Sequence, residues 1–266
     1  MIKTRILAGI MAIGLAATPA AARSLDDIIA DGTIRIGVNP NFPPMSAYGD
    51  TNELEGFDVD IGRKLAEALG VEAEFVPTES QQRVPFLVSD RIDISMGALT
   101  RTVARDKLID FTVPLHTEAM ATLTTKKVTA ESWRDLDTSD ITLVNMRGNW
   151  SVDFLKEKLP QADVLLVDTI ADTVRAVAQG RGDAIVENID FFMKFTQNYP
   201  DVEWRVIEDT VFVAYCGIGV SQGNATLQSV LNIALYDLHS SGTVNATWEK
   251  WYGAPMLKPV VPQPFF

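Results

Sequence analysis

The sequence predicts an α/β protein made of two similar units that are joined by extended crossovers. Strand-like apolar runs alternate with amphipathic helical runs between residues 34 and 108, and the same alternation restarts over residues 141–186. Two β-rich segments, residues 117–127 and 212–221, lie outside the alternating runs. Alternating strands and helices favour a largely parallel sheet in each unit, and two extended connections between two lobes form a hinge.

The first unit begins with a strand over residues 34–38, where apolar and polar side chains alternate. Residues 39–44 (NPNFPP) form an irregular loop, because proline interrupts both ladders and helices. We expect Asp58 to cap a helix that carries Ile61, Leu65 and Leu69 on one face and ends at Gly70. The same periodicities predict strands over 71–76 and 92–96 and helices over 81–88 and 103–108.

The second unit repeats this pattern, and two further helices follow it. Strands are expected over 141–144, 163–167 and 183–186, and helices over 152–158, 170–179, 227–238 and 244–251. We expect Trp248 and Trp251 to pack in the core. The predicted first lobe comprises residues 23–118 and 218–266, and the second lobe comprises residues 119–217.

The N-terminus has the pattern of a cleavable signal peptide, which we assign to residues 1–22. A basic segment, residues 1–5, precedes an apolar run to Ala17, and residues 20–22 (AAA) fit a cleavage site. The apolar run is shorter than the ~20 residues that a membrane span needs. We therefore expect cleavage after Ala22 and a mature protein in the periplasm.

Composition excludes several classes of function. The formal net charge of −12 disfavours nucleic acid and anionic lipid as partners. Cys216 is the single cysteine and lies in an apolar run, so we expect it to be buried and inert. The two histidines have no Cys or His cluster near them in the sequence, and we expect no metal site and no cofactor. We expect a monomer.

The most informative run for function is residues 97–105 (GALTRTVAR). It places small residues and hydroxyls before a helix start, and Arg105 follows within one turn. Backbone N–H groups at such a start attract anions, and an arginine beside them can grip a carboxylate through two hydrogen bonds. An amphipathic helix with an exposed arginine is the alternative.

Several motifs follow one another in an order typical of one family. They are residues 36–44 (IGVNPNFPP), 55–60 (EGFDVD), 102–105 (TVAR) with 110–112 (DFT), Gly148, 180–184 (GRGDA) and 251–253 (WYG). In this order the chain resembles the bacterial family-3 extracytoplasmic solute-binding proteins, the amino-acid receptors of ABC importers. The resemblance covers residues 32 to about 253. It implies two hinge-closing lobes, a ligand between them, and a membrane permease as partner.

The resemblance also implies roles for particular residues. Arg105 would pair with the ligand α-carboxylate, Thr100 would add its hydroxyl and N–H, and the Ala98 carbonyl would accept from the amine. Phe42 would form an aromatic wall, and Ser80 would begin the side-chain pocket. From the other lobe, the carboxylate would be held by the backbone after Gly148, at Asn149 and Trp150.

The sequence departs from the family pattern at the positions that usually bind the amine. Asn39 and Asn188 stand where carboxylates are usual, and Trp150 replaces a smaller residue. Glu187 could supply the missing charge, but a neighbouring strand residue normally faces the other way. We therefore hypothesise a carboxylate ligand whose amine is absent, substituted or only weakly recognised. An ordinary amino acid, held by amide oxygens and the Ala98 carbonyl, is the alternative.

We expect a binding protein and not an enzyme. Some relatives on this scaffold are cyclohexadienyl dehydratases, and such an enzyme needs a general acid in the cleft, for which Glu187 and Glu79 are the candidates. A further possibility is a ligand-reporting partner of a membrane sensor, whose lobes would look the same.

Overall fold

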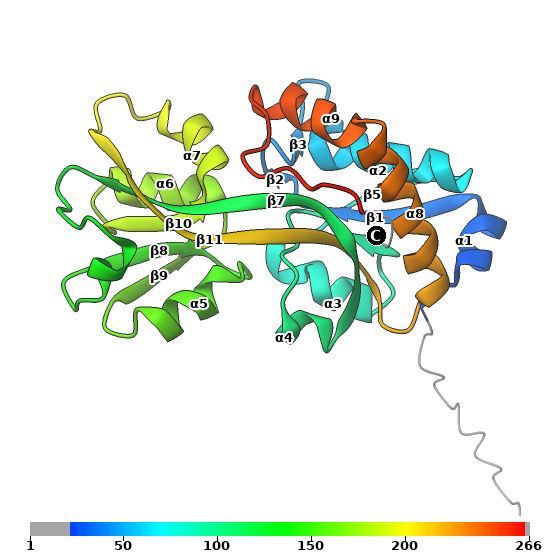
Figure 1. The fold of residues 1–266 in the computed structure, drawn as a ribbon, viewed down its shortest axis with the longest axis horizontal. Helices are drawn as coiled ribbons and strands as arrows, with labels where there is room; N and C mark the ends of the chain where they lie inside the picture. Colours follow the sequence, from blue (N-terminus) through cyan, green and yellow to red (C-terminus); the bar gives the residue numbers. More distant parts are fainter. Residues whose placement is uncertain (1–21, 264–266) are drawn as a thin grey trace, which may run out of the picture.

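The computed structural model describes residues 22–263, and its elements form two lobes connected by two long strands (Figure 1). The connecting strands are β7 (Ile109–Thr125) and β11 (Trp204–Ser221), which pair antiparallel over most of their length. Both run from one lobe into the other (Figure 1). They extend well beyond the predicted crossover segments at 117–127 and 212–221.

The first lobe surrounds one end of this strand pair. Its strands are β1 (Thr33–Val38), β5 (Glu72–Pro77) and β6 (Ile94–Ser95), together with a small sheet of β2 (Asn41–Phe42), β3 (Ser46–Tyr48) and β4 (Leu54–Glu55). Its helices are α1 (Leu25–Asp31), α2 (Phe57–Leu69), α3 (Arg83–Val88), α4 (Val103–Asp106), α8 (Ala225–Ser240) and α9 (Thr243–Tyr252), and a 3-10 turn covers Ser80–Gln82.

The second lobe surrounds the other end. Its strands are β8 (Thr142–Met146), β9 (Asp163–Val167) and β10 (Ala184–Asn188). Its helices are α5 (Ser151–Lys158), α6 (Ile170–Ala178) and α7 (Ile189–Thr196), and a 3-10 turn covers Trp133–Leu136.

The strands of both lobes join in one eight-stranded sheet with the order β5-β1-β6-β11-β7-β10-β8-β9. Within each lobe the outer strands pair in parallel, whereas β7 and β11 pair antiparallel with each other and with their neighbours. The predicted α/β fold with two lobes and two connecting strands is thus confirmed. The exact lobe boundaries, 23–118 with 218–266 and 119–217, stay predictions.

One predicted helix start is wrong. Gly56 is the N-cap of α2, with a φ of 135°, and Asp58 lies inside the first turn. Asp58 is only 1% exposed, and its carboxylate accepts a hydrogen bond of 2.8 Å from the Gly97 N–H. The side chain therefore points into the lobe to hold a distant loop, and it does not cap its own helix.

The described part of the chain also contains elements that the periodicity does not reveal. Helix α7 follows β10 without a break, and the small sheet begins with β2 inside the segment 39–44, which we expected to be an irregular loop. The predicted helix over 81–88 is divided into the 3-10 turn and α3. The predicted signal peptide, residues 1–22, lies outside the described residues except for Ala22.

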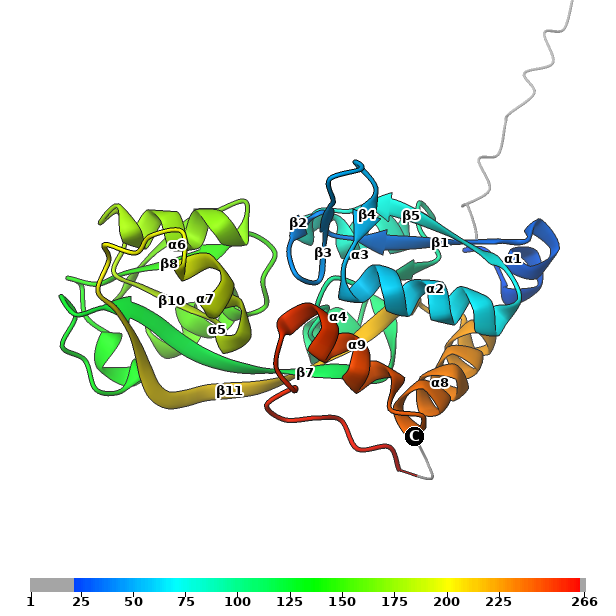
Figure 2. The same cartoon turned by 90° about the horizontal axis from the view of Figure 1, so that it is seen from above.

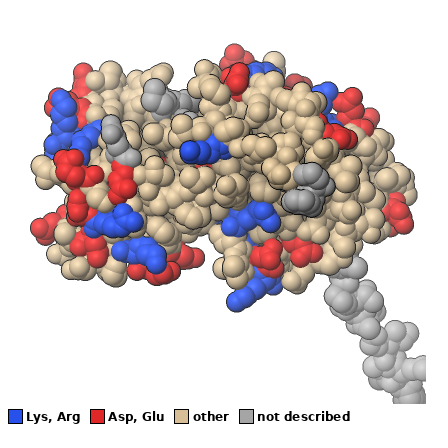
Figure 3. Space-filling model, in the orientation of Figure 1, with Lys and Arg blue, Asp and Glu red and all other residues tan. Residues whose placement is uncertain are grey.

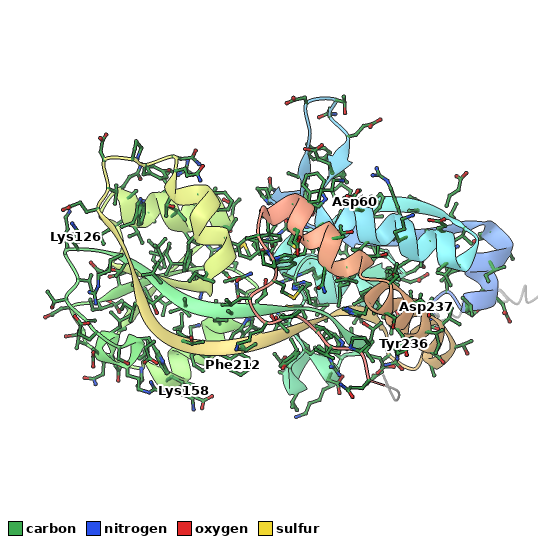
Figure 4. The ribbon with its side chains drawn as sticks, turned by 45° about the horizontal axis from the view of Figure 1, so that its top comes forward. Asp60, Lys126, Lys158, Phe212, Tyr236 and Asp237 are labelled. Atoms are coloured by element: carbon green, nitrogen blue, oxygen red, sulfur yellow. The ribbon has the colours of Figure 1, made fainter. Side chains whose placement is uncertain are left out.

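An aromatic cluster anchors the C-terminal helix to the first lobe. Trp248 is fully buried, stacks on Tyr252 at 3.9 Å between ring centroids, and contacts the edge of Phe57 at 5.4 Å. Lys250 and Trp251 donate to Asp60 of α2, the residue labelled at the top of the first lobe in Figure 4. The predicted core position of Trp248 is confirmed.

The chain after α9 returns along β7, as Figure 2 shows for the red segment. Met256 and Val260 are buried there. The Thr117 N–H lies 3.5 Å from the Met256 sulfur, and the Thr117 hydroxyl donates to the Lys258 carbonyl. No helix in the described part of the chain is long and apolar enough to cross a membrane.

Candidate functional site

A small cavity lies where the two lobes meet. Five of its lining residues come from the first lobe, four come from the second, and one comes from strand β7. The cavity volume is about 10 Å³, which is room for about one water. The lining residues are Phe42, Arg83, Ala98, Thr100, Arg105, Glu118, Met146, Asn149, Trp150 and Glu187.

A wider groove of about 370 Å³ lies beside this cavity and shares Arg105, Asn149 and Trp150 with it. Its remaining lining comes from α4, the Gly148 turn and α5. The space-filling view is hollowed at its lower edge between the lobes, where these elements face each other (Figure 3). Because the cavity has room for about one water, a larger molecule could enter it only if its walls separated.

Arg105 connects the two lobes at the cavity wall. Thr102 caps α4 and accepts from the Arg105 N–H at 3.2 Å, which fixes the start of the side chain. The guanidinium donates to the Thr100 carbonyl at 2.8 Å and, across the cleft, to the Gly148 carbonyl at 2.9 Å. Burial lowers the pKa of Arg105 from its usual value, but an arginine remains charged at neutral pH.

A second arginine, Arg83, lies in the same cavity and was missed by the sequence analysis. Its side chain is buried, and it donates to carbonyl oxygens of Ser80 at 3.0 Å, Ala98 at 3.3 Å and Gly148 at 3.2 Å, and also to that of Gly97. Burial lowers its pKa to about 9. Arg83 directly precedes the apolar residues 84–88, and a charged residue at the start of such a run was the signal that could have identified it.

The loop between β6 and α4 is held in an unusual conformation. Ala98 has a φ of 52°, a region that residues other than glycine rarely adopt. The loop is held from one side by Arg83 and from the other by Asp58, through the Gly97 N–H. Burial raises the pKa of Asp58 to about 7. Such local strain persists where surrounding contacts impose it, and it often occurs at ligand sites.

The second lobe approaches through the turn before α5. Gly148 has a φ of 75°, and a Cβ at this position would lie 2.8 Å from the Gln81 backbone nitrogen in the first lobe. Glycine therefore allows the two backbones to approach. The Asn149 side chain accepts from the Ser151 N–H at 3.0 Å and donates to the Glu187 carboxylate.

Trp150 supplies an aromatic wall and a buried donor. Its ring centroid lies 5.5 Å from that of Phe154 and 5.2 Å from that of Phe212, the β11 residue labelled in Figure 4. The indole Nε1 is buried and has no hydrogen-bond partner among the described residues. A buried N–H of this kind is costly unless an acceptor reaches it, so a ligand oxygen fits there.

Phe42, the predicted aromatic wall, is buried in the cavity lining and packs on Phe191 of the second lobe at 4.5 Å between centroids. The same cavity is also lined by Ala98, Thr100, Arg105, Asn149 and Trp150. Their implied contacts with a ligand stay predictions. The structure thus brings six predicted side chains or backbone positions together.

Four predicted site residues are not among the cavity-lining residues. Gly148 lies at the adjacent groove. The Asn39 side chain donates to the Ser80 hydroxyl at 3.0 Å, and both residues are buried behind the wall. Asn188 is fully buried at the end of β10.

The prediction of which β10 residue faces the cavity is wrong. Glu187, which we expected to face away, lines the cavity, and it is 2% exposed. Its carboxylate accepts from the Asn188 N–H at 3.0 Å and from Asn149. Burial raises the pKa of Glu187 to about 7. A carboxyl group therefore faces the cavity although Asn39 and Asn188 are amides.

Strand β7 adds a second carboxylate, Glu118, which the sequence analysis also missed. Glu118 is 3% exposed and accepts from the Cys216 thiol at 3.4 Å. Burial raises the pKa of Cys216 well above its usual value, which favours the protonated thiol. The predicted burial of Cys216 is confirmed.

The histidines are less isolated than the sequence suggests. The pairing of β7 with β11 brings ligand-type atoms of His116, Glu118 and Cys216 within 4.8 Å of one another. Residues 116 and 216 are too far apart in the sequence for spacing to show this. The expectation that the chain has no metal site stays a prediction.

Comparison with known proteins agrees with this arrangement. Residues 34–254 match the family described as bacterial extracellular solute-binding proteins, family 3. The chain is 28% identical to the L-cystine-binding protein TcyJ of Escherichia coli, over 95% of this chain and 96% of that protein. It is 27% identical to the L-arginine-binding protein of Pseudomonas aeruginosa, over 86% of this chain and 91% of that protein.

Among solved structures, an ancestral amino acid-binding protein, AncCDT-1, described as a precursor of cyclohexadienyl dehydratase, superposes with a TM-score of 0.78. It is 30% identical, and the match covers 86% of this chain and 99% of that one. The family match spans most of the described residues and includes both lobes. The chain therefore belongs to the bacterial extracellular solute-binding proteins of family 3.

Proposed function

We propose that this protein is an extracytoplasmic receptor that binds an amino acid between its lobes and delivers it to the membrane permease of an ABC importer. The observation that carries the proposal is the position of the Arg105 guanidinium, which lines the cavity and hydrogen-bonds across the cleft to Gly148. Relatives named as cystine- and arginine-binding proteins support an amino acid as ligand.

The ligand carboxylate takes the place of the Gly148 carbonyl at Arg105. Two parallel N–H donors of a guanidinium match a carboxylate in geometry as well as charge. The Thr100 hydroxyl and the buried Trp150 N–H lie in the same lining and can donate to it. Hydrogen bonds to charged groups contribute about 1.5–3 kcal/mol each, so three or four approach the ~8 kcal/mol of micromolar binding.

The ligand amine is bound by Glu187. This assignment replaces the hypothesis of an absent, substituted or weakly recognised amine, whose premise was that no carboxylate faces the cleft. Glu187 lines the cavity, and its hydrogen bond from Asn149 orients the carboxylate. An ammonium group beside a buried carboxylate is favourable because it offsets the cost of burying that charge.

Titration calorimetry with the twenty amino acids and their deaminated analogues tests this proposal. We expect at least one L-amino acid to bind, its deaminated analogue to bind more weakly, and Arg105→Ala to abolish binding. Arg101→Ala is the matched control, because Arg101 is exposed two residues before the α4 start. Full binding by Arg105→Ala would contradict the proposed site.

The export and partner assignments are tested separately. The mature protein is expected in the periplasm with Arg23 as its first residue, as a monomer that engages a permease. Mass spectrometry of the periplasmic fraction gives the N-terminus, and light scattering gives the oligomeric state. Neighbouring permease and ATPase genes would support transport, whereas a neighbouring sensor-kinase gene would support signalling.

A dehydratase activity is the second candidate, and one observation favours it. Glu187 lies in the cavity with a pKa near 7, which suits a general acid. The other candidate, Glu79, has its carboxylate at 2.7 Å from the Asn41 side chain and does not line the cavity. Incubation with arogenate and prephenate tests this: turnover that Glu187→Gln abolishes would establish the enzyme and displace the receptor proposal.

A further inference from the structure

A chain of polar side chains runs through the second lobe from strand β8 to Glu187 in the cavity. Asn145 lies on β8, Ser151 begins α5, and Asn149 lies in the turn between these two elements. The Asn145 amide donates to the Ser151 hydroxyl at 2.8 Å, and this hydroxyl donates to the side-chain oxygen of Asn149 at 2.9 Å. The Asn149 amide in turn donates to the Glu187 carboxylate. Asn145 and Ser151 are at most 1% exposed, and neither lines the cavity.

Two backbone groups fix the direction of these hydrogen bonds. The Met146 N–H donates to the Asn145 side-chain oxygen at 2.7 Å, and the Ser151 N–H donates to the Asn149 side-chain oxygen at 3.0 Å. A backbone N–H can only donate, so each of these oxygens is the acceptor, and each amide NH2 group is left to donate elsewhere. The NH2 group of Asn149 therefore faces Glu187, and the Ser151 hydroxyl holds the other end of the same amide.

Both oxygens of the Glu187 carboxylate accept a hydrogen bond. One accepts from Asn149 at the end of this chain, and the other accepts from the Asn188 N–H at 3.0 Å. Such bonds favour the ionised form, whereas burial favours the neutral form and raises the pKa of Glu187 to about 7. The chain thus offsets part of the cost of keeping a charged carboxylate in a closed cavity.

We propose that Ser151 and Asn145 are positioning residues for amine binding, because they hold the Asn149 amide as the donor that orients the Glu187 carboxylate. The inference rests on the proposed function, in which Glu187 binds the ligand amine. The effect of both residues reaches the ligand through Asn149 and Glu187. A substitution at Ser151 therefore changes recognition of the amine and leaves recognition of the carboxylate intact.

Carboxyl-carbon NMR of protein labelled with isotopic glutamate tests the chain without any ligand. The Glu187 signal is identified by its absence in Glu187→Gln, and its chemical shift is followed from acidic to alkaline pH. Ser151→Ala removes the hydroxyl that holds the Asn149 amide, so Glu187 should titrate at a pH roughly half a unit or more above that of the wild type. An unchanged titration would overturn the inference.

Thr173→Val is the matched control. Thr173 is buried in the same lobe, and its hydroxyl donates to the Ile170 carbonyl at 2.6 Å within α6. This variant also loses a buried hydroxyl, so it should lower stability, but it should leave the Glu187 titration and the ligand affinity unchanged.

The charged groups around Glu187 are the same in all of these proteins, so their influence cancels in the comparison. Strand β8 carries no charged residue. The groups are Arg83, Arg105 and Glu118 in the cavity lining, the paired Asp172 and Arg175 of α6, and, in the sequence of α7, Asp190 and Lys194.

Titration calorimetry tests the link to the amine, with the L-amino acid that the wild type binds most tightly and with its deaminated analogue. Ser151→Ala should weaken binding of the L-amino acid about fivefold and leave binding of the analogue unchanged. In the Glu187→Gln background, Ser151→Ala should cause no further loss of affinity, because it acts through the carboxylate that is missing. Equal weakening of both ligands, or the same loss in both backgrounds, contradicts the positioning role.

The outcomes distinguish this inference from the proposed function. If the wild type binds an amino acid, and Ser151→Ala changes neither the Glu187 titration nor the preference for the amine, the inference is overturned and the receptor function stands. If no amino acid binds while the Glu187 titration shifts in Ser151→Ala, the proposed function is overturned and the hydrogen-bond chain to Glu187 is supported.

Discussion

The two lobes are built alike but contribute different chemistry to the cavity between them. The first lobe contributes the cationic side chains, Arg83 and Arg105, and the loop at Ala98. The second lobe contributes the carboxylate of Glu187 and the aromatic wall of Trp150. Under the proposed function, lobe closure would bring opposite charges to opposite ends of a zwitterion and would make binding depend on both lobes at once.

The largest expected effect comes from removing the cationic contact of the first lobe. Arg105→Ala removes two charge-assisted hydrogen bonds, which corresponds to a loss of roughly 3–6 kcal/mol of binding free energy. Calorimetry of this variant, with the amino acid that the wild type binds most tightly, should then detect no binding. Arg105→Lys retains the charge without the paired donors and should bind weakly.

The carboxylate of the second lobe makes stability depend on pH. The pKa of Glu187 rises from 4.5 to about 7, so its contribution to stability is full below pH 4.5 and is lost as the pH rises through 7. The unfolding free energy of Glu187→Gln, relative to that of the wild type, should therefore be higher at pH 8 than at pH 4.5. The expected difference is up to roughly 3 kcal/mol.

Urea denaturation of the ligand-free wild type and variant at both pH values measures this difference. Asp58 and His116 also titrate with shifted pKa values, to about 7 and about 4, but they are common to both proteins and cancel in the comparison. If the unfolding free energy of the two proteins changed with pH in the same way, Glu187 would not be held in a buried, unfavourable environment.

The close approach of the lobes is tested at Gly148. In Gly148→Ala the new Cβ lies 2.8 Å from the Gln81 backbone nitrogen, so the closed form is strained and ligand affinity should fall by roughly tenfold or more. Gly180→Ala is the matched control, because Gly180 has a similar φ of 71° and no atom within 4 Å of its added Cβ.

Gly180→Ala should lose only about 1 kcal/mol of stability, because alanine is disfavoured in the left-handed conformation, and it should keep its ligand affinity. Small-angle scattering with saturating ligand separates the two variants, since Gly148→Ala should remain more extended. Equal affinity in both variants would mean that the lobes do not need this contact.

The smallest effect is expected beside the same turn. Arg147 pairs with Asp168 at 2.8 Å, but both side chains are at least half exposed. Arg147→Ala should change the unfolding free energy by less than about 0.5 kcal/mol and leave affinity unchanged. A large loss of affinity would place the ligand closer to the surface than the cavity lining indicates.

The fold and half of the cavity could be predicted from the sequence because their signals are local. Alternating apolar runs predicted most strands and helices, and the run that ends in Arg105 supplies three residues of the cavity lining. The carboxylates could not be predicted in this way. Glu118 comes to the cavity through its place on a long shared strand, and Glu187 faces it through the orientation of β10.

The roles of Arg83 and Asp58 could not be predicted from the sequence for a related reason. Their partners, Ala98 and Gly97, lie in a distant loop, so the contacts depend on how α2 and α3 pack against it. The amphipathic pattern of α2 and the capping preference of aspartate made a local role for Asp58 the simpler prediction. Tertiary contacts that span 39 residues overrode it.

The path of the chain has a consequence for the order in which the molecule assembles. The second lobe is formed by one continuous stretch, whereas the first lobe needs both ends of the chain, as the contact between Thr117 and Met256 across 139 positions shows. Because the chain is synthesised from its N-terminus, the second lobe is complete before α8 and α9 are made. The first lobe, which carries Arg83 and Arg105, is thus finished last, and under the proposed function ligand binding would have to wait until α8 and α9 are in place.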